Sequence, residues 1–289
     1  MNKDPLVTIV LPFYNNKSTL LLAVKSVICQ TYPNWELILL DDGSVDGSLE
    51  IAKSLESANI QVRSDGLNKG LIARLNQMAS LGSGEFLARM DADDLMQPTR
   101  IEEQMKMFKA QPELDLVDTG TYSIDEMGNP VGIRGLGPIN YEPKAVLKSA
   151  MLLHASVIGK RSWFNRNPYD PDYVRAEDYE LWCRTFRHSK FGRVPKPLYI
   201  VREGRVNIKN YERSSETIRK IMRKYGVGVF SPLELQIELL KSHLKVLLYR
   251  IFGAFNQHGY LSKKRNNPLS NTEREELGGL MRTIEAANI

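Results

Sequence analysis

The sequence predicts an α/β protein organised around a mostly parallel sheet. Apolar runs and amphipathic segments alternate four times within about 95 residues, as they do when strands are joined by crossover helices. The first runs are continuous rather than alternating, which is typical of strands covered on both faces. With 289 residues, 42% of them hydrophobic, the chain is long enough to bury a large core.

Each predicted strand is an apolar run bounded by proline, glycine or polar residues. The strands span residues 6–11, 35–40, 60–63, 86–88, 115–124, 154–159 and 194–201. Pro12 should end the first of them, and the last, which has prolines only toward its ends, should be an edge strand. Turn-forming residues predict loops at 131–143 and 165–172, and a further loop is expected at 160–161.

Each predicted helix carries apolar residues at helical spacing. The helices span residues 18–27, 48–55, 71–79, 100–110, 141–151, 176–187, 214–225, 233–255 and 272–287. Ser18 should cap the first, and Asp46 or Ser48 the second, because short polar side chains accept hydrogen bonds from the free N–H groups at a helix N-terminus.

Charge and pattern divide the chain near residue 210. The alternating elements occupy a body of residues 1–210, and the remainder, 211–289, is helical and basic. Residues 1–110 have a net charge of −3, whereas residues 201–289 have a net charge of +7. This asymmetry suggests an anionic partner for the C-terminal region, either lipid headgroups or nucleic acid.

The composition also indicates a cellular compartment. No run approaches the roughly 18 to 20 apolar residues of a membrane-spanning helix, and the N-terminal residues lack the pattern of a signal peptide. Cys29 and Cys183 lie far apart, so neither a disulfide framework nor a metal-binding spacing is expected. These features predict a cytoplasmic protein.

A cluster of carboxylates follows the strand at 86–88. Asp91, Asp93 and Asp94 fall within four positions, and burying such like charges unpaired would cost several kcal/mol each. A divalent cation, or a cation with a phosphate ligand, would relieve their repulsion. The alternative is a solvated turn that caps the next helix.

Two other predicted strands also end in polar segments, at 12–15 and 41–44. Ligands bind beyond the carboxyl ends of the strands in such sheets, so the three segments should meet at one ligand-binding edge. The chain contains neither G-x-G-x-x-G nor G-x-x-x-x-G-K-[ST], which disfavours a redox dinucleotide and a P-loop. The phosphates of a bound nucleotide would therefore need Asp91 and Asp93, acting through Mg²⁺ or Mn²⁺.

A second candidate site lies at the start of the helix at 176–187. Glu177 and Asp178 stand in its first turn, where the helix dipole alone favours acidic residues. A carboxylate held there is also rigid and can face a cleft, as a general base must. The residues alone leave both interpretations open.

The predicted helix at 233–255 is amphipathic. Its leucines and isoleucines follow helical spacing, and Lys241, Lys245 and Arg250 lie toward its other faces. Such a helix either packs on the body or in a dimer seam, or it lies on an anionic membrane surface.

Six stretches over roughly residues 6–200 together resemble the inverting glycosyltransferases of family 2. In order they read VTIVLPFYN, QTYPNWELILLDDGSVDGS, NKGLIARLNQM, GEFLARMDADDLMQPTRI, HASVIGKRS and AEDYELWCR. The resemblance implies the GT-A fold, a Rossmann-like sheet flanked by helices. It also implies a nucleotide-binding half at about 1–110 and an acceptor half at about 111–210, followed by the helical C-terminal extension.

The resemblance assigns a donor site. The donor would be a nucleotide-diphospho-sugar, most often a UDP-sugar. Residues that match the family's donor site are Pro12, Tyr14, Asn15, Asp41, Asp42, Lys69, Asp91, Ala92 and Asp93. Asp42 would contact uracil, and Lys69 would make a further nucleotide contact. Asp91-Ala92-Asp93 matches the D-x-D motif that holds Mn²⁺ or Mg²⁺ on the diphosphate.

The resemblance also assigns a base. Asp178 matches the acid that serves as general base in this family, with Glu177 as second choice. His154 would contact the acceptor or the diphosphate, or else be a structural histidine. Asp94 is expected to have a local role beside the D-x-D motif.

Two departures shape the expected function. Processive family members usually carry Q-x-x-R-W and transmembrane helices, and this sequence shows neither, so it resembles a transferase of single sugars. Its basic C-terminal region fits an enzyme that meets an anionic membrane surface through residues 214–267. A lipid-linked oligosaccharide acceptor at the inner membrane face is then expected, as in bacterial capsule, O-antigen or exopolysaccharide assembly. A homodimer is the alternative for this region, and no nucleic acid partner is expected.

Two other functions compete with this one. A nucleotidyltransferase also uses an α/β sheet and acidic metal ligands, but it normally needs a glycine-rich, basic first loop, which PFYNN is not. A non-catalytic nucleotide-sugar-binding or membrane scaffold protein would keep the binding site without the transfer reaction.

Overall fold

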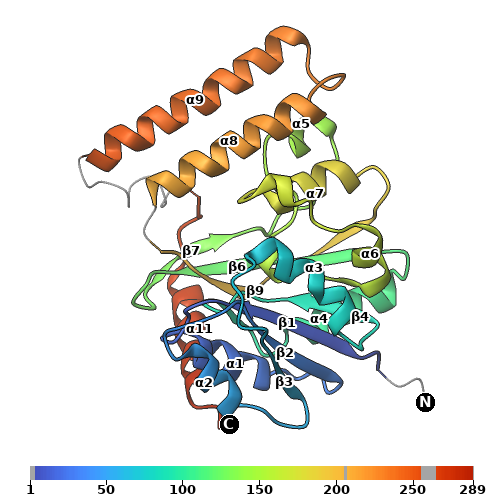
Figure 1. The fold of residues 1–289 in the computed structure, drawn as a ribbon, viewed down its shortest axis with the longest axis vertical. Coiled ribbons are helices and arrows are strands. Elements are labelled where there is room, and N and C mark those ends of the chain that lie inside the picture. Colours follow the sequence, from blue (N-terminus) through green and yellow to red (C-terminus); the bar gives the residue numbers. More distant parts are fainter. Residues whose placement is uncertain (1–3, 205–206, 255–264, 289) are drawn as a thin grey trace.

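The computed structural model describes residues 4–204, 207–254 and 265–288. Within these residues the strands form one nine-stranded sheet in the order β3-β2-β1-β4-β8-β6-β9-β5, with β7 paired to β6 (Figure 1). The strands are β1 Val7–Phe13, β2 Trp35–Asp41, β3 Ile60–Arg63, β4 Phe86–Arg89, β5 Leu95–Met96, β6 Leu116–Ile124, β7 Pro130–Arg134, β8 Ile158–Lys160 and β9 Phe191–Arg202.

The helices of the body are α1 Leu20–Ile28, α2 Ser48–Ser54, α3 Leu71–Leu81, α4 Arg100–Ala110, α5 Pro143–Val146, α6 Arg161–Arg166 and α7 Glu177–Thr185. Two short 3₁₀ turns, η1 at His154–Ser156 and η2 at Pro171–Tyr173, lie in the second half of the body. The C-terminal helices are α8 Ile208–Tyr225, α9 Pro232–Ala254 and α11 Asn271–Glu285.

The first half of the sheet has the predicted strand–helix–strand architecture. Strands β1, β2, β3 and β4 pair in parallel, and side chains from β1 alternate between two hydrophobic clusters. Ile9 and Leu11 join the cluster that α1, α2 and α4 cover, whereas Val10 joins the cluster that α3, α6 and α7 cover. Helices therefore bury both faces, which explains why the strand sequences are continuously apolar.

The second half of the sheet is mixed. Strand β8 runs antiparallel to β4 and β6, and β7 runs antiparallel to β6, whereas β6 and β9 pair in parallel. The α/β prediction is confirmed, and the antiparallel pairs appear where the regular alternation of strands and helices in the sequence stops.

The structure corrects two predictions about prolines and edges. Pro12 does not end β1, because the strand continues to Phe13. The Pro12 nitrogen faces the β4 side, where pairing has already ended at Val10 and Arg89, so no ladder hydrogen bond is lost. Strand β9 is not an edge strand, because it lies between β6 and β5.

Local assignments in the second half are also corrected. The segment predicted as a loop at 131–143 contains most of β7, and the loop predicted at 160–161 is the direct junction of β8, which ends at Lys160, with α6, which starts at Arg161. The predicted helix at 141–151 is helical only over α5, and the first part of the predicted strand at 154–159 is the turn η1. These are short elements, in which tertiary pairing outweighs the local sequence preference.

The C-terminal helices lie at two places on the molecule. Helices α8 and α9 lie side by side at one end, whereas α11 runs along the body beside α1 (Figure 1). A third hydrophobic cluster joins Leu277 and Ile284 of α11 to Tyr122 and Ile200 of the sheet. The division of the chain near residue 210 remains a prediction.

Candidate active site

The carboxyl ends of β1, β2 and β4 meet at one edge of the sheet, as predicted. Asp41 closes β2 opposite Phe13 of β1, and the backbone N–H of Asp42 donates to the Phe13 carbonyl at 2.8 Å. The Asp41 carboxylate accepts hydrogen bonds from the Ser44 N–H at 3.0 Å and from the Ser64 hydroxyl at 2.7 Å. Both aspartates are buried, so this wall of the site is rigid.

Asp42 organises the loop before α3. Its Oδ1 accepts from the Lys69 N–H and from Arg74 Nε, each at 2.8 Å, and its Oδ2 accepts from the Gly70 N–H at 3.0 Å. A Cβ on Gly43 would come within 2.9 Å of this loop's backbone, so a glycine is needed there. The uracil contact predicted for Asp42 remains a prediction, and the structure shows that the side chain also holds the loop.

The loop after β1 is held against the loop after β2. The Asn15 N–H donates to the Ser44 hydroxyl at 3.0 Å, and the Val45 N–H donates to Asn15 Oδ1 at 2.9 Å. Asn15 has φ = 55°, a left-handed conformation that asparagine tolerates better than most residues. Tyr14 is exposed beside it, so its ring is free to contact a ligand.

The D-x-D segment is paired with an arginine from the preceding strand. Arg89 Nη2 lies 2.7 Å from Asp91 Oδ1, and the arginine is almost fully buried. Burial and then the charge of Asp91 raise the pKa of Asp93. The two predicted metal ligands therefore differ, because Asp91 has a cationic partner at contact distance while Asp93 is held in a site that disfavours its own charge.

Asp94 anchors the D-x-D segment to β9. Its Oδ1 accepts a hydrogen bond from the Arg202 N–H at 2.8 Å, and the Tyr199 hydroxyl, which also bonds Asp94, accepts from the Asp91 N–H at 3.1 Å. Burial, Asp91 and Asp93 hold the pKa of Asp94 well above its usual value. This geometry fits the local role expected for Asp94.

The predicted base lies at the start of α7. Asp178 Oδ2 is 4.0 Å from Nδ1 of His154, and the Asp178 side chain is 28% exposed. Burial raises the pKa of Asp178, while Arg89 opposes this shift. Burial and then Arg89 lower the pKa of His154 well below its usual value. Tyr169 completes the group, because its hydroxyl is 2.8 Å from Nε2 of His154.

Arg89 connects the two halves of the site. It forms the contact with Asp91 and interacts electrostatically with Asp178 and Tyr169. Within the described part of the chain its Nε is buried without a hydrogen-bond partner, although buried polar groups are normally satisfied. The D-x-D segment and the base candidate thus share one buried cation.

The side chains present fit a divalent metal ion only in part. Among the described residues, no three His, Cys, Asp or Glu side chains are grouped to hold an ion by themselves. Asp91 and Asp93 supply hard oxygen donors, as Mg²⁺ and Mn²⁺ prefer. The raised pKa of Asp93 indicates a carboxylate without full charge compensation. The pair therefore fits an ion whose remaining ligands come from a diphosphate and water.

A cavity of about 760 Å³ adjoins the base candidate. Lys69 and Glu177 both line it, and Ser214 of α8 also contributes to the lining. Lys69 Nζ contacts Asp65 Oδ2 at 2.6 Å and is partly exposed. The cavity is therefore bounded both by a predicted donor contact and by the neighbour of the predicted base.

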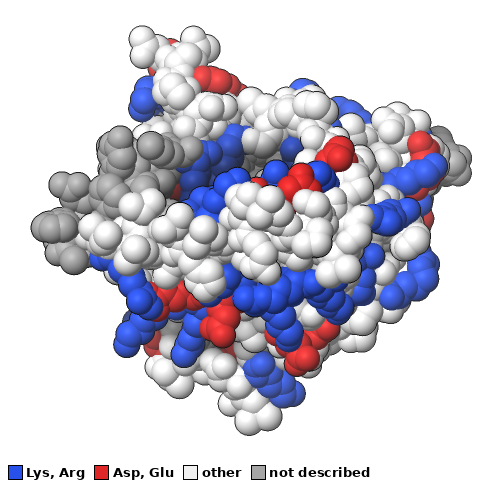
Figure 2. Space-filling view, turned by 90° about the horizontal axis from the view of Figure 1, so that it is seen from above, with Lys and Arg blue, Asp and Glu red and all other residues white. Residues whose placement is uncertain are grey.

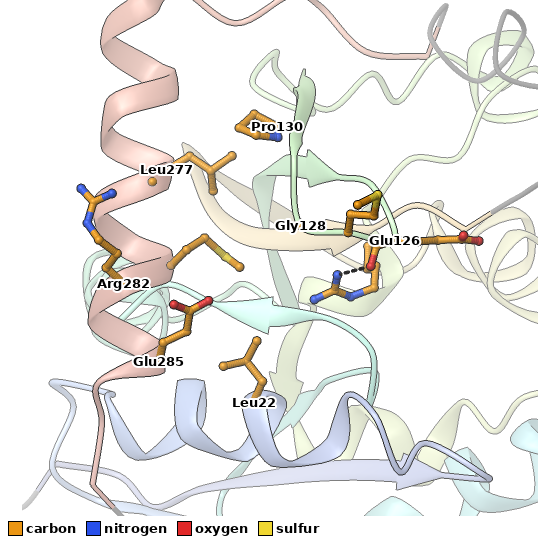
Figure 3. Close-up of a pocket in the computed structure, with 11 residues that line it drawn as sticks. Leu22, Glu126, Gly128, Pro130, Leu277, Arg282 and Glu285 are labelled. Atoms are coloured by element: carbon orange, nitrogen blue, oxygen red, sulfur yellow. Dashed lines mark hydrogen bonds between the residues drawn. The ribbon is translucent and has the colours of Figure 1, made fainter.

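A smaller cavity of about 370 Å³ lies between α11, α1 and the turn after β6. Leu277 and Glu285 of α11 point toward it, and Leu22 of α1 lies on its other side (Figure 3). None of the predicted site residues lines this cavity. We assign it no part in the site.

Sequence reasoning did not identify Arg89, Tyr169 or Tyr199 as site residues. Arg89 carried a signal, because an arginine within the apolar strand before the aspartates is expected to be paired if it is buried. The tyrosines carried none, since their positions depend on how η2 and β9 return to the D-x-D segment. The predicted site residues between Pro12 and His154 lie at the carboxyl edge of the sheet or in the loops beside it.

Comparisons with known proteins identify the family. The model of "Glycosyl transferase family 2" matches residues 8–170. The chain is 34% identical over 212 residues to a putative glycosyltransferase EpsE of Bacillus subtilis, covering 70% of this chain and 75% of that protein. It is 28% identical over 191 residues to the UDP-Glc:alpha-D-GlcNAc-diphosphoundecaprenol beta-1,3-glucosyltransferase WfgD of Escherichia coli, covering 66% and 74%.

Solved structures share the fold at low sequence identity. Residues 1–349 of S. aureus TarS in complex with UDP-GlcNAc give a TM-score of 0.60 at 14% identity, covering 83% of this chain and 72% of that one. The mannosyltransferase PcManGT of Pyrobaculum calidifontis, in complex with GDP-Man and Mn²⁺, gives a TM-score of 0.57 at 17% identity. This match covers 99% of this chain and 86% of that one. The likeness confirms the predicted GT-A fold.

Proposed function

The chain belongs to glycosyl transferase family 2, and from that membership we propose that it transfers one sugar, with inversion, from a nucleotide-diphospho-sugar to a saccharide acceptor. The transferred group would be a hexosyl or N-acetylhexosaminyl unit, and the nucleotide would be UDP. Family membership sets aside the alternative of a nucleotidyltransferase, and the scaffold alternative becomes an outcome of the test below.

The observation that carries the proposal is the convergence on Arg89. Asp91 contacts this arginine at 2.7 Å, and Asp178, from a helix far along the chain, interacts with the same charge. A sugar donor held at the D-x-D segment would therefore present its anomeric carbon near a carboxylate on a separate element. One carboxylate pair for the diphosphate and one isolated carboxylate for the base is the set that an inverting transfer requires.

Asp178 would act as the base. One carboxylate oxygen takes the proton from the acceptor hydroxyl, whose oxygen then forms the bond to the anomeric carbon. The bond from that carbon to the diphosphate oxygen breaks on the opposite face, and the electron pair leaves with the nucleoside diphosphate. The His154 ring, held neutral by its lowered pKa, contacts Asp178 without forming a full ion pair, which leaves the carboxylate free to accept a proton.

The D-x-D carboxylates would hold the metal ion, Mn²⁺ or Mg²⁺, through Asp91 and Asp93. When bound, such an ion stabilises the negative charge that develops on the leaving diphosphate. Arg89 would orient Asp91 for this purpose, because its Nη2 lies 2.7 Å from Asp91 Oδ1. The named Mn²⁺ complex of PcManGT supports this assignment.

Relatives support the choice of donor and acceptor. WfgD is named for transfer from UDP-Glc to a diphosphoundecaprenol-linked sugar, and TarS is described with UDP-GlcNAc. We therefore propose that this chain uses a UDP-sugar donor and a lipid-linked saccharide acceptor. The reaction would belong to surface polysaccharide assembly, such as that of O-antigen or capsule. Within the described residues no helix combines the length and apolar character needed to cross a bilayer.

A donor screen tests the proposal. The purified chain is heated with Mn²⁺ and each of several UDP- and GDP-sugars, and the correct donor should raise Tm, because a ligand that binds the folded state stabilises it. Transfer to a synthetic lipid-linked acceptor is then measured with the donor that stabilises most. Stabilisation without transfer or donor hydrolysis would favour the scaffold alternative. Stabilisation by GDP-sugars alone would overturn the choice of UDP.

A further inference from the structure

Helix α9 is apolar on two opposite faces. Its inner face packs on α8 and the body through buried side chains such as Leu239 and Tyr249, and the Tyr249 ring stacks on Tyr211 of α8 with centroids 3.9 Å apart. Its outer face carries Leu233, which is 71% exposed, and six further large apolar side chains, each between 43% and 59% exposed: Ile237, Leu240, Leu244, Leu247, Leu248 and Ile251. The apolar face of a helix normally packs against another surface, so the outer face is expected to meet a partner.

These six side chains, which we call the α9 stripe, form one continuous surface. At about 100° per residue they fall within an arc of about 100°, and at about 1.5 Å per residue they extend over about 20 Å. Single exposed apolar residues need no explanation, but a contiguous stripe marks an interaction surface. Seen from the end of the molecule that carries α9, uncharged surface runs across the centre, with Lys and Arg beside it and smaller groups of Asp and Glu among them (Figure 2).

The charge around the stripe is positive. Residues 207–254 contain nine Lys and Arg and four Glu, a net charge of +5. Helical spacing places Lys241 and Lys245 along one border of the stripe and Arg250 along the other. Three acidic side chains pair with cations here: Glu234 contacts Lys144 at 2.8 Å, Glu238 contacts Lys241 at 2.9 Å, and Glu212 of α8 contacts Arg250 at 2.5 Å. The net positive charge remains after these pairs are counted.

We propose that the α9 stripe and its basic borders dock on the surface of a membrane that contains anionic lipids. Leucine and isoleucine side chains at this spacing enter the boundary between headgroups and acyl chains, while flanking Lys and Arg side chains pair with lipid phosphates. A second copy of the chain would instead bring one basic face against an identical basic face. Charge complementarity therefore favours the lipid surface over a homodimer.

Docking in this way would place the candidate active site close to the lipid. Helix α8 lies between α9 and the body, and its residue Ser214 lines the cavity of about 760 Å³ beside Glu177. One helix layer thus separates the cavity from the proposed docking helix. This link between docking and a lipid-linked acceptor rests on the proposed function, whereas the docking itself does not.

Vesicle flotation of the full chain tests the proposal. The wild-type chain should float with vesicles of phosphatidylcholine and phosphatidylglycerol, and much less with phosphatidylcholine alone. Replacing Leu240→Glu and Leu244→Glu together should lower the bound fraction by more than about tenfold, since two apolar side chains that would enter the lipid become charged. Met127→Glu is the matched control, because Met127 is 88% exposed on the turn between β6 and β7 and should leave flotation unchanged.

A lysine variant tests the electrostatic part of docking, and measurements of folding and sedimentation distinguish lost docking from misfolding or dimerisation. Lys241→Gln with Lys245→Gln should weaken flotation mainly on the anionic vesicles and reduce its dependence on salt. Circular dichroism and Tm of each variant should match the wild type, because the altered side chains are exposed. Equal flotation of the wild type and the double glutamate variant would overturn the proposal. If the wild type does not float but sediments as a dimer, and the double glutamate variant sediments as a monomer, then the partner of the stripe is a second copy of the chain and not a membrane.

Activity on a water-soluble acceptor separates this proposal from the proposed function. The double glutamate variant should transfer sugar to such an acceptor at the wild-type rate, because no altered residue lies in the candidate site. Absence of transfer by both proteins would contradict the proposed function and leave the flotation result standing.

Discussion

Replacing Asp178 with asparagine should separate catalysis from binding and stability. The change keeps the side-chain shape and removes the proposed base. General base catalysis contributes about 10²- to 10⁴-fold, so the transfer rate should fall by that factor, which corresponds to about 3–5 kcal/mol of activation free energy. Stability should change by less than about 1 kcal/mol, because Asp178 is partly exposed and 4.0 Å from a histidine that burial keeps neutral.

The assay measures three quantities on the same preparation: the transfer rate at saturating donor, the Kd for UDP with Mn²⁺, and the free energy of unfolding in urea. Glu177→Gln is the matched control, because Glu177 stands one residue earlier in the same helical turn and also has a raised pKa through burial and Asp178. We expect this control to lose less than about tenfold in rate. Loss of UDP binding by Asp178→Asn, or a larger loss of rate in the control, would refute the assignment of the base.

Three further predictions follow from the charges around the site. Asp93→Asn should weaken UDP binding in Mn²⁺ by roughly tenfold or more while binding without metal is unchanged; equal titrations with Mn²⁺ would contradict the metal role. Arg89→Met and Arg193→Met each break a buried ion pair and should each lower the free energy of unfolding by about 3 kcal/mol. Only Arg89→Met should also impair Mn²⁺-dependent binding of UDP. If both variants impaired UDP binding equally, the role of Arg89 in connecting Asp91 and Asp178 would be refuted. Burial holds the pKa of His154 well below its usual value, so the unfolded chain takes up a proton at this residue below about pH 6.5 while the folded chain does not. On acidification His154 should therefore lower the free energy of unfolding by up to about 1.4 kcal/mol per pH unit. In urea unfolding, the free energy of His154→Gln should fall less steeply with pH than that of the wild type, and equal slopes would contradict a buried neutral His154.

The parts of the fold that the sequence predicts best are those set by local pattern. The strands of the first half and α3, α4 and α7 lie close to their predicted positions, because continuous apolar runs and helical spacing are properties of neighbouring residues. The position of β9 inside the sheet depends instead on pairing with β6 and β5, which lie far away in the sequence. The prolines of β9 suggested an edge strand. The pairing of β6 with β9 shifts register between Thr119 and Thr121, so the proline-containing segment of β9 is left out of the pairing.

The candidate site divides in the same way. Residue types and the edge rule for parallel sheets led to Asp91 and Asp93, whereas Asp178 was assigned from the resemblance to family 2. Arg89 was missed although it contacts Asp91, because its partner could be named only once the conformation after β4 was known. The hydrogen bonds from Asp42 to the loop before α3 were missed for the same reason. Sequence pattern thus predicted the charged groups of the candidate site more readily than the groups that hold them in place.

The packing of α11 has a consequence for the order in which the chain can fold. Asn267 pairs with Ile133 of β7, and Lys25 Nζ of α1 donates to the Glu285 carbonyl at 2.7 Å. During synthesis, domains begin to fold from their N-terminal side, yet the apolar surfaces of Tyr122 and Ile200 remain uncovered until residues 265–285 have left the ribosome. Final closure of the body must therefore follow the synthesis of α11. A nascent chain that stalls after α9 would expose this apolar surface to chaperones.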